Sequence, residues 1–152
     1  MQNQMNKYRR LKNLFLRQSY LDAWEDYQRS ILKKSFPKWD YIVLTASNEE
    51  QGKAFQKQIE YRSEKGVLPD ATKFLVIPDP DGKRIGSGGA TLHVLRTLSE
   101  REGFLGDFHG KRILVIHSGG DSKRVPQYSV CGKLFSPVPR ELPDGRGSTL
   151  FD

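Results

Sequence analysis

The chain has 152 residues, enough for one domain with a substantial core but not for two independent cores. Hydrophobic residues make up 36% of it and charged residues 28%, a balance typical of globular rather than disordered or membrane proteins. No apolar run approaches the ~20 residues that a membrane-spanning helix needs, and the first residues lack the apolar centre of a secretory signal. The single cysteine, Cys131, excludes an internal disulfide and fits a reducing compartment. These features predict a cytoplasmic protein.

The net charge of +7 is concentrated near the amino terminus. Residues 1–40 hold nine Lys or Arg against four Asp or Glu, whereas the remaining residues hold sixteen against fourteen. One interpretation is a face that meets nucleic acid or an acidic partner. The other is a solvated helix surface, which Asp22, Glu25 and Asp26 favour because they interrupt the positive charge.

The first predicted elements are helical. Apolar residues recur at roughly helical spacing over residues 6–34, which predicts one or two amphipathic helices. Ser19 and Asp22 would mark the restart if there are two, because they resemble a capping box. Pro37 closes this region, since proline disfavours helix in the residue before it.

Five further elements alternate between strand and helix. Short apolar runs rich in β-formers predict strands, and longer charged or leucine-spaced stretches predict helices. In chain order these elements are a strand at 41–46, a helix at 48–65, a strand at 73–77, a helix at 88–102 and a strand at 112–117. Alternation of this kind predicts an α/β fold with a mainly parallel sheet.

The regular pattern fades after residue 117. Residues 118–149 contain five Gly and four Pro and show no clear helical or alternating period. We expect residues 144–147 to be a plain turn. Loops of this length are uncommon in a compact domain unless they are functional or unfinished, so the candidate chemistry is expected here.

The last predicted strand runs into two glycines and then into closely spaced cations. Gly119 and Gly120 allow the backbone to approach a phosphate and turn its N–H groups towards it. Ser122 adds a side-chain donor, Arg124 can bind phosphate oxygens through two parallel hydrogen bonds, and Lys133 adds a compact charge. Two glycines after a strand are often only a tight turn. With a hydroxyl and two cations nearby, the pattern favours a phosphate site.

A second glycine cluster, Gly86, Gly88 and Gly89, stands at the start of the helix at 88–102. Two interpretations have equal weight: a glycine-rich helix start that allows close packing, and an anion site at a helix N-terminus. A dinucleotide fingerprint matches poorly, because no apolar strand runs directly into the cluster and Thr91 takes the place of the third glycine.

Two stretches resemble one family. HSGGDSKRVP at residues 117–126, followed by GKLFSPVP at 132–139, resembles the nucleotide loop of the sugar-1-phosphate nucleotidyltransferases. Its form is similar to that of the fucose-1-phosphate guanylyltransferases (GDP-fucose pyrophosphorylases), including the pyrophosphorylase half of bifunctional fucokinase enzymes. DPDGKRIGSGGATL at 79–92 resembles the second signature of that family. The resemblance covers roughly residues 38–152 and implies the amino-terminal part of a truncated nucleotidyltransferase domain, which the helical segment at 1–37 precedes.

The resemblance implies transfer from GTP to L-fucose 1-phosphate, giving GDP-L-fucose and pyrophosphate, with a divalent metal, usually Mg²⁺. By motif position, Arg124 and Lys133 would stabilise charge on the phosphates, and N–H groups around Gly119, Gly120 and Ser122 would hold the triphosphate. The implied fold is an incomplete Rossmann-like, nucleotidyltransferase-type sheet preceded by amino-terminal helices. Enzymes of this type place an acidic metal ligand and the sugar-binding residues further downstream. The 152 residues alone are therefore expected to be inactive.

Two other hypotheses stay open. A non-catalytic remnant would bind nucleotide without turnover. A basic helical arm would bind RNA or an acidic partner, and this hypothesis ranks well behind the enzyme. The cations of that arm are Lys7, Arg9, Arg10, Lys12 and Arg17. No membrane partner is expected, and the sequence does not fix the oligomeric state.

Overall fold

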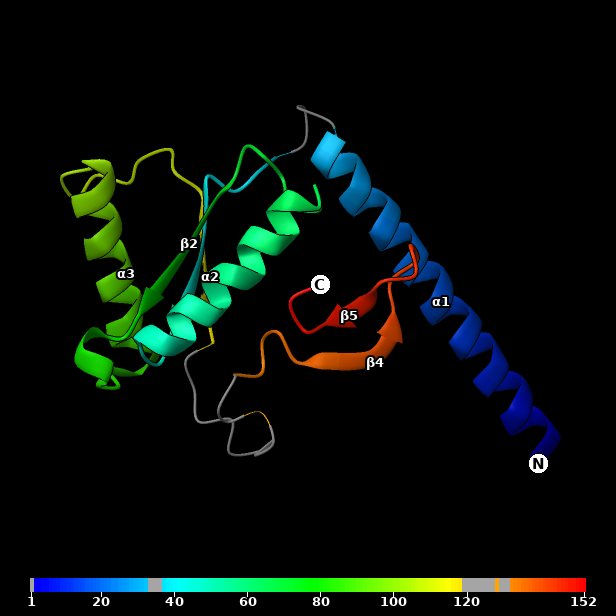
Figure 1. Ribbon diagram of the computed structural model, residues 1–152. Helices are drawn as coiled ribbons and strands as arrows, with labels where there is room; N and C mark the ends of the chain where they lie inside the picture. Colours follow the sequence, from blue (N-terminus) through cyan, green and yellow to red (C-terminus); the bar gives the residue numbers. More distant parts are fainter. Residues whose placement is uncertain (1, 33–36, 119–127, 129–131) are drawn as a thin grey trace.

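A computed structural model describes residues 2–32, 37–118, 128 and 132–152. These residues form a three-stranded sheet with a helix on each face, a long amino-terminal helix, and a two-stranded hairpin near the carboxyl end (Figure 1). In the described residues, no helix combines the length and the hydrophobicity that crossing a membrane requires.

Three parallel strands form the central sheet, in the order β2-β1-β3. The strands are β1 (Tyr41–Ala46), β2 (Lys73–Pro78) and β3 (Ile113–His117). Tyr41 is level with Lys73 on one side and with Ile113 on the other, so the three strands start together. The predicted α/β class and the parallel sheet are confirmed.

Two helices cover opposite faces of this sheet (Figure 1). α2 (Glu49–Glu64) begins after Asn48, whose side chain accepts a hydrogen bond from the Gln51 N–H at 2.8 Å and so caps the helix. It ends just before Gly66, which has a φ of 64°. α3 (Gly86–Glu102) begins two residues earlier than the sequence predicts.

The sheet separates two apolar cores. On one face, Val43 of β1 packs with Val94 and Leu98 of α3, and all three are fully buried. On the other face, Leu44 packs with Phe55 of α2, which is equally buried. Neighbouring residues of a strand point to opposite faces, so one short apolar strand contributes to both cores. Burial of each such side chain stabilises the fold by about 1.5–3 kcal/mol.

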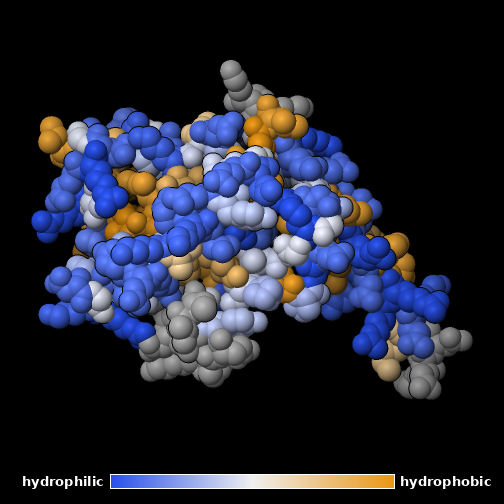
Figure 2. Space-filling view, viewed as in Figure 1, coloured by the Kyte–Doolittle hydropathy of each residue, from blue (hydrophilic) through white to orange (hydrophobic). Residues whose placement is uncertain are grey.

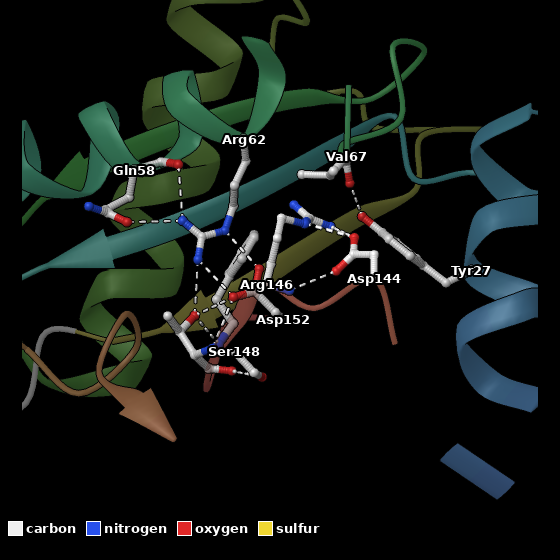
Figure 3. Close-up of polar contacts among 10 residues, drawn as sticks. Tyr27, Gln58, Arg62, Val67, Asp144, Arg146, Ser148 and Asp152 are labelled. Atoms are coloured by element: carbon white, nitrogen blue, oxygen red, sulfur yellow. Dashed lines mark hydrogen bonds and ion pairs between the residues drawn. The ribbon is translucent and has the colours of Figure 1, made fainter. Parts of the chain in front are cut away.

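α1 (Gln2–Leu32) is one continuous helix, without the restart at Ser19 that two helices would need. Its carboxyl half contacts the body: the Tyr27 hydroxyl donates to the carbonyl of Val67, as Figure 3 shows. Its amino half projects away from the rest of the molecule (Figure 1). A cavity of about 490 Å³ lies between α1 and the sheet, with Trp24 and Phe74 among its mainly apolar lining residues.

The region after β3 is more regular than predicted. β4 (Pro137–Glu141) and β5 (Gly147–Thr149) form an antiparallel hairpin that the sequence analysis missed. Prolines obscure it, because proline is rare in strands other than edge strands. The predicted turn at 144–147 is where this hairpin reverses, with Gly145 at a φ of 83°.

A buried arginine joins α2 to the end of the hairpin (Figure 3). The Arg62 guanidinium makes two hydrogen bonds of 2.8 Å to the Asp152 carboxylate and one of 3.1 Å to the Thr149 hydroxyl. It also donates to the Gln58 carbonyl at 3.2 Å and lies 4.9 Å from the Phe135 ring centroid. Burial raises the pKa of Asp152, but the hydrogen bonds from Arg62 and Thr149 outweigh it and hold the pKa below its ordinary value.

Replacing Arg62 by methionine should lower the free energy of unfolding by about 3 kcal/mol, because Asp152 would keep its charge without a cationic partner. Urea unfolding followed by circular dichroism measures the change. Arg96→Met is the control, since its pair with Glu100 has side chains 79% and 63% exposed and should contribute about 0.5 kcal/mol or less. Equal losses in the two variants would contradict the role given to Arg62.

Candidate functional site

The carboxyl ends of the three strands form one edge of the sheet, and the candidate site is built on it. From β1 the chain crosses to β2 on one side, whereas β3 lies on the other side, so the strand order reverses between β1 and β3. Ligands of open α/β sheets bind outside the carboxyl ends of the strands next to such a reversal. α2 and α3 each follow a strand, so their N-termini face this edge, where they favour anions.

Two buried residues with hydroxyl side chains, Thr45 near the end of β1 and Ser118 just after β3, join these two strands by hydrogen bonds. The Ser118 N–H donates to the Thr45 hydroxyl at 3.2 Å, and the Ser118 hydroxyl donates to the Thr45 carbonyl. Thr45 is 4% exposed and Ser118 3% exposed. The chain therefore enters the predicted phosphate loop from a fixed point at the reversal. Four predicted site residues of that loop lie outside the described residues: Gly119, Gly120, Ser122 and Arg124. Their roles stay predictions.

Side chains also join α3 to the end of β3. The Thr91 hydroxyl lies 3.1 Å from His117 Nε2 and donates to the Ser87 carbonyl at 3.0 Å. This contact brings the first turns of α3, and with them the second glycine cluster, to the strand end that leads into the predicted loop.

The three glycines of that cluster have different surroundings. Gly86 has a φ of 69°, in the left-handed region that favours glycine. A Cβ on Gly89 would lie 2.9 Å from the Cβ of Ile85. Gly88 has neither constraint, and a Cβ there would enter open space. Backbone conformation therefore explains Gly86 and packing explains Gly89, but neither explains Gly88.

Lys133 is exposed in a short turn, in which the Ser136 N–H donates to the Lys133 carbonyl at 3.1 Å. The preceding Gly132 has a φ of 74° and packs against α2, where a Cβ would lie 2.9 Å from both Gln51 Nε2 and Phe55 Cζ. Gln51 belongs to the first turn of α2. The turn that carries Lys133 is thus held against a helix N-terminus at the same edge of the sheet.

The sequence analysis missed a buried carboxylate at this edge. Asp79 follows β2 directly, is 9% exposed, and accepts a hydrogen bond from the Ile85 N–H. Burial raises its pKa, and electrostatic interactions with His93, Arg84 and His117 only partly oppose this rise. A signal was available, because an acid directly after a strand falls on the carboxyl edge.

In the described part of the chain, no group of side chains forms a ligand set for the predicted Mg²⁺. No three His, Cys, Asp or Glu side chains there are grouped so that they would hold a metal ion. Two buried or half-buried carboxylates already bind protein groups, Asp79 the backbone of Ile85 and Asp152 the guanidinium of Arg62. The described residues therefore supply no all-protein ligand set, and Mg²⁺ stays a prediction.

Comparison with known proteins matches these signatures. Residues 106–152 match the model of the fucose pyrophosphorylase domain. A bifunctional fucokinase/GDP-fucose pyrophosphorylase from Arabidopsis thaliana is 41% identical over 137 residues, which is 76% of this chain and 13% of that protein. The chain belongs to the fucose pyrophosphorylase family. The predicted resemblance is confirmed.

Other members of the fucose pyrophosphorylase family are equally similar. Fucose-1-phosphate guanylyltransferase from Mus musculus is 40% identical over 102 residues, and that from Homo sapiens 39% over the same length. Each alignment covers 66% of this chain, 17% of the mouse protein and 16% of the human protein. The chain thus spans less than a fifth of these relatives. No solved structure matches the chain.

Alanine substitutions at the three glycines of α3 separate packing from ligand binding. Gly86→Ala and Gly89→Ala should each lower the free energy of unfolding by about 1 kcal/mol or more, because the first strains the backbone and the second meets Ile85. Gly88→Ala should leave stability unchanged or raise it by up to about 1 kcal/mol, since alanine has the higher helix propensity. Urea unfolding measures all three.

GTP titration of the Gly88→Ala chain then decides the role of this glycine. A stable variant with weakened GTP binding would give Gly88 a ligand role. Unchanged affinity would leave Gly88 without a ligand role.

Proposed function

We propose that this chain forms the nucleotide-binding part of a fucose-1-phosphate guanylyltransferase, acting on GTP and L-fucose 1-phosphate. An oxygen of the sugar phosphate attacks the α-phosphorus of GTP. The bond from that phosphorus to the oxygen that bridges to the β-phosphorus breaks, so GDP-L-fucose forms and pyrophosphate leaves. The names of the mouse and human relatives support this reaction class.

One observation carries the proposal: the position at which the chain leaves β3 is fixed. Ser118 is buried and bonded twice to Thr45, and it lies within the segment that matches the family model. The residues that follow it carry the phosphate-binding signature. With the N-termini of α2 and α3 facing the same edge, backbone N–H groups and cations would gather around one polyphosphate. In this proposal the three strands belong to a Rossmann-like, nucleotidyltransferase-type sheet within a domain at 38–152.

The proposed roles follow from charge. Arg124 and Lys133 stabilise the negative charge that develops on the phosphates, while N–H groups around Gly119, Gly120 and Ser122 hold the triphosphate in line. Such transfer depends on positioning and neutralisation more than on proton transfer. When bound, Mg²⁺ would neutralise phosphate oxygens. We also propose that the protein is cytoplasmic.

Isothermal titration with GTP tests this function directly. The chain should bind GTP more tightly than GMP, because the β- and γ-phosphates add contacts to the loop. Arg124→Ala and Lys133→Ala should each weaken GTP binding by about tenfold or more, the loss expected for a hydrogen bond to a charged group. Lys57→Ala, at an exposed position in the middle of α2, is the control and should keep its affinity.

Equal affinity for GTP and GMP, or no effect of either loop variant, would contradict the proposal. GTP binding without pyrophosphate release in the presence of L-fucose 1-phosphate is expected of the 152 residues alone. The same result in every longer form of the protein would favour the alternative of a non-catalytic nucleotide-binding chain.

An exposed basic helix supports a second candidate function, the binding of RNA. In the projecting half of α1, Tyr8 is 71% and Phe15 70% exposed, and cations lie between them. Figure 2 shows apolar residues exposed among hydrophilic ones on this part of the molecule. Aromatic rings interleaved with cations are typical of surfaces that bind single-stranded nucleic acid.

Fluorescence anisotropy with a labelled single-stranded RNA tests the second candidate. The chain should bind at low salt and release the RNA as salt rises, because phosphate contacts displace counterions. Replacing five cations by glutamine should abolish the binding: Lys7, Arg9, Arg10, Lys12 and Arg17. Glutamine at Lys53, Lys57 and Lys65, on or just after α2, provides the charge control. No binding at low salt would dismiss this function.

A further inference from the structure

A buried glutamine links several parts of the carboxyl edge. Gln51 is 6% exposed, and its Oε1 accepts hydrogen bonds from the Ser47 N–H at 2.9 Å and from the Ser47 hydroxyl at 3.1 Å. Its own N–H donates to the Asn48 side chain at 2.8 Å. These three bonds fix the glutamine at the point where β1 leads into α2.

The orientation of the amide follows from these bonds. Because Oε1 takes both bonds from Ser47, Nε2 is directed elsewhere, and it lies against Gly132. A Cβ on residue 132 would be 2.9 Å from Nε2 and equally close to Phe55 Cζ. Phe55 is 1% exposed and packs edge-on against Phe135, with ring centroids 5.3 Å apart. Gln51 and Phe55 therefore form a rigid floor under Gly132.

The turn above this floor is fixed by its own bonds. The Ser136 hydroxyl donates to the Gly132 carbonyl at 3.3 Å, and the Ser136 N–H to the Lys133 carbonyl at 3.1 Å. Ser136 is 5% exposed, whereas Lys133 is exposed. With a φ of 74° at Gly132, a residue with a side chain would be strained at this position and would also meet the floor. The contacts with Gln51 and Phe55 therefore fix the position of the backbone from which Lys133 projects.

We propose that Gln51 is a positioning residue, which holds the backbone of Gly132 and Lys133 against the carboxyl end of β1 and so aims Lys133 at the nucleotide phosphates. The inference rests on the proposed function, because it gives Gln51 an effect only through Lys133. Charged groups that act on a ligand need such support from a surrounding shell of fixed side chains. Gln51 supplies it without touching the nucleotide.

A double-mutant cycle on GTP binding tests the inference. Gln51→Met keeps the size of the side chain but removes its amide, and it should weaken GTP binding by roughly fivefold. In a Lys133→Ala background the same substitution should change the affinity by less than about twofold, because the residue on which it acts is gone. Gln56→Met, at a partly exposed glutamine of α2 paired with Glu60, is the matched control and should bind GTP like the unmodified chain.

Gly132→Ala tests the same contact from the other side, and it decides the question if Gln51→Met does not fold. It should also weaken GTP binding, and it should add little in the Lys133→Ala background. Equal weakening in both backgrounds would show a packing role only and overturn the inference. Wild-type affinity in a folded Gln51→Met or Gly132→Ala chain would do the same. If Lys133→Ala itself leaves GTP binding unchanged, the proposed function fails first and the inference fails with it.

Discussion

β1 is enclosed by a helix on each face and by a parallel strand on each side, so packing on all four sides fixes the position of its carboxyl end. Ser118, which leads from β3 into the predicted loop, is bonded there to Thr45. The residues after β1 lead directly into Asn48 and Gln51 at the start of α2. A shift of β1 by one residue would exchange the side chains of its two faces and displace both attachments. Core packing and site geometry therefore depend on the same register.

Buried polar side chains are concentrated at this end of the sheet. Thr45, Gln51, Asp79, Ser118 and Ser136 are all 9% exposed or less, and each makes at least one hydrogen bond. Buried polar groups destabilise a fold unless they are paired, so such a cluster permits few alternative arrangements. The described part of the carboxyl edge is thus held in place by the protein's own hydrogen bonds. Preorganisation of this kind is what a site for a highly charged transition state requires.

Local patterns predicted the strands and helices of the sheet, because apolar runs and helical spacing are properties of neighbouring residues. They could not predict the bond between Thr45 and Ser118, which depends on β3 pairing with β1 rather than with β2. The β4–β5 hairpin was missed for a related reason: its proline-rich strand has no alternating pattern, and contacts with α2 through Arg62 hold its far end. Lys133 was found from its motif, whereas Gln51, which fixes the turn beneath it, carries no signal in a single sequence.

The glycines of the two signatures are not equally informative about function. Positive φ angles or contacts with the protein's own atoms account for Gly86, Gly89 and Gly132, so these glycines say little about catalysis. Lys133 differs, because it is exposed and lies outside both cores. Its turn nevertheless contains a glycine at positive φ and rests on a buried amide, two features that do not favour folding by themselves. The turn also places Leu134 and Phe135 against the core around Leu44 and Phe55, so packing accounts for its order. The charge and exposure of Lys133, rather than the glycines, are therefore the features of this turn that support phosphate binding.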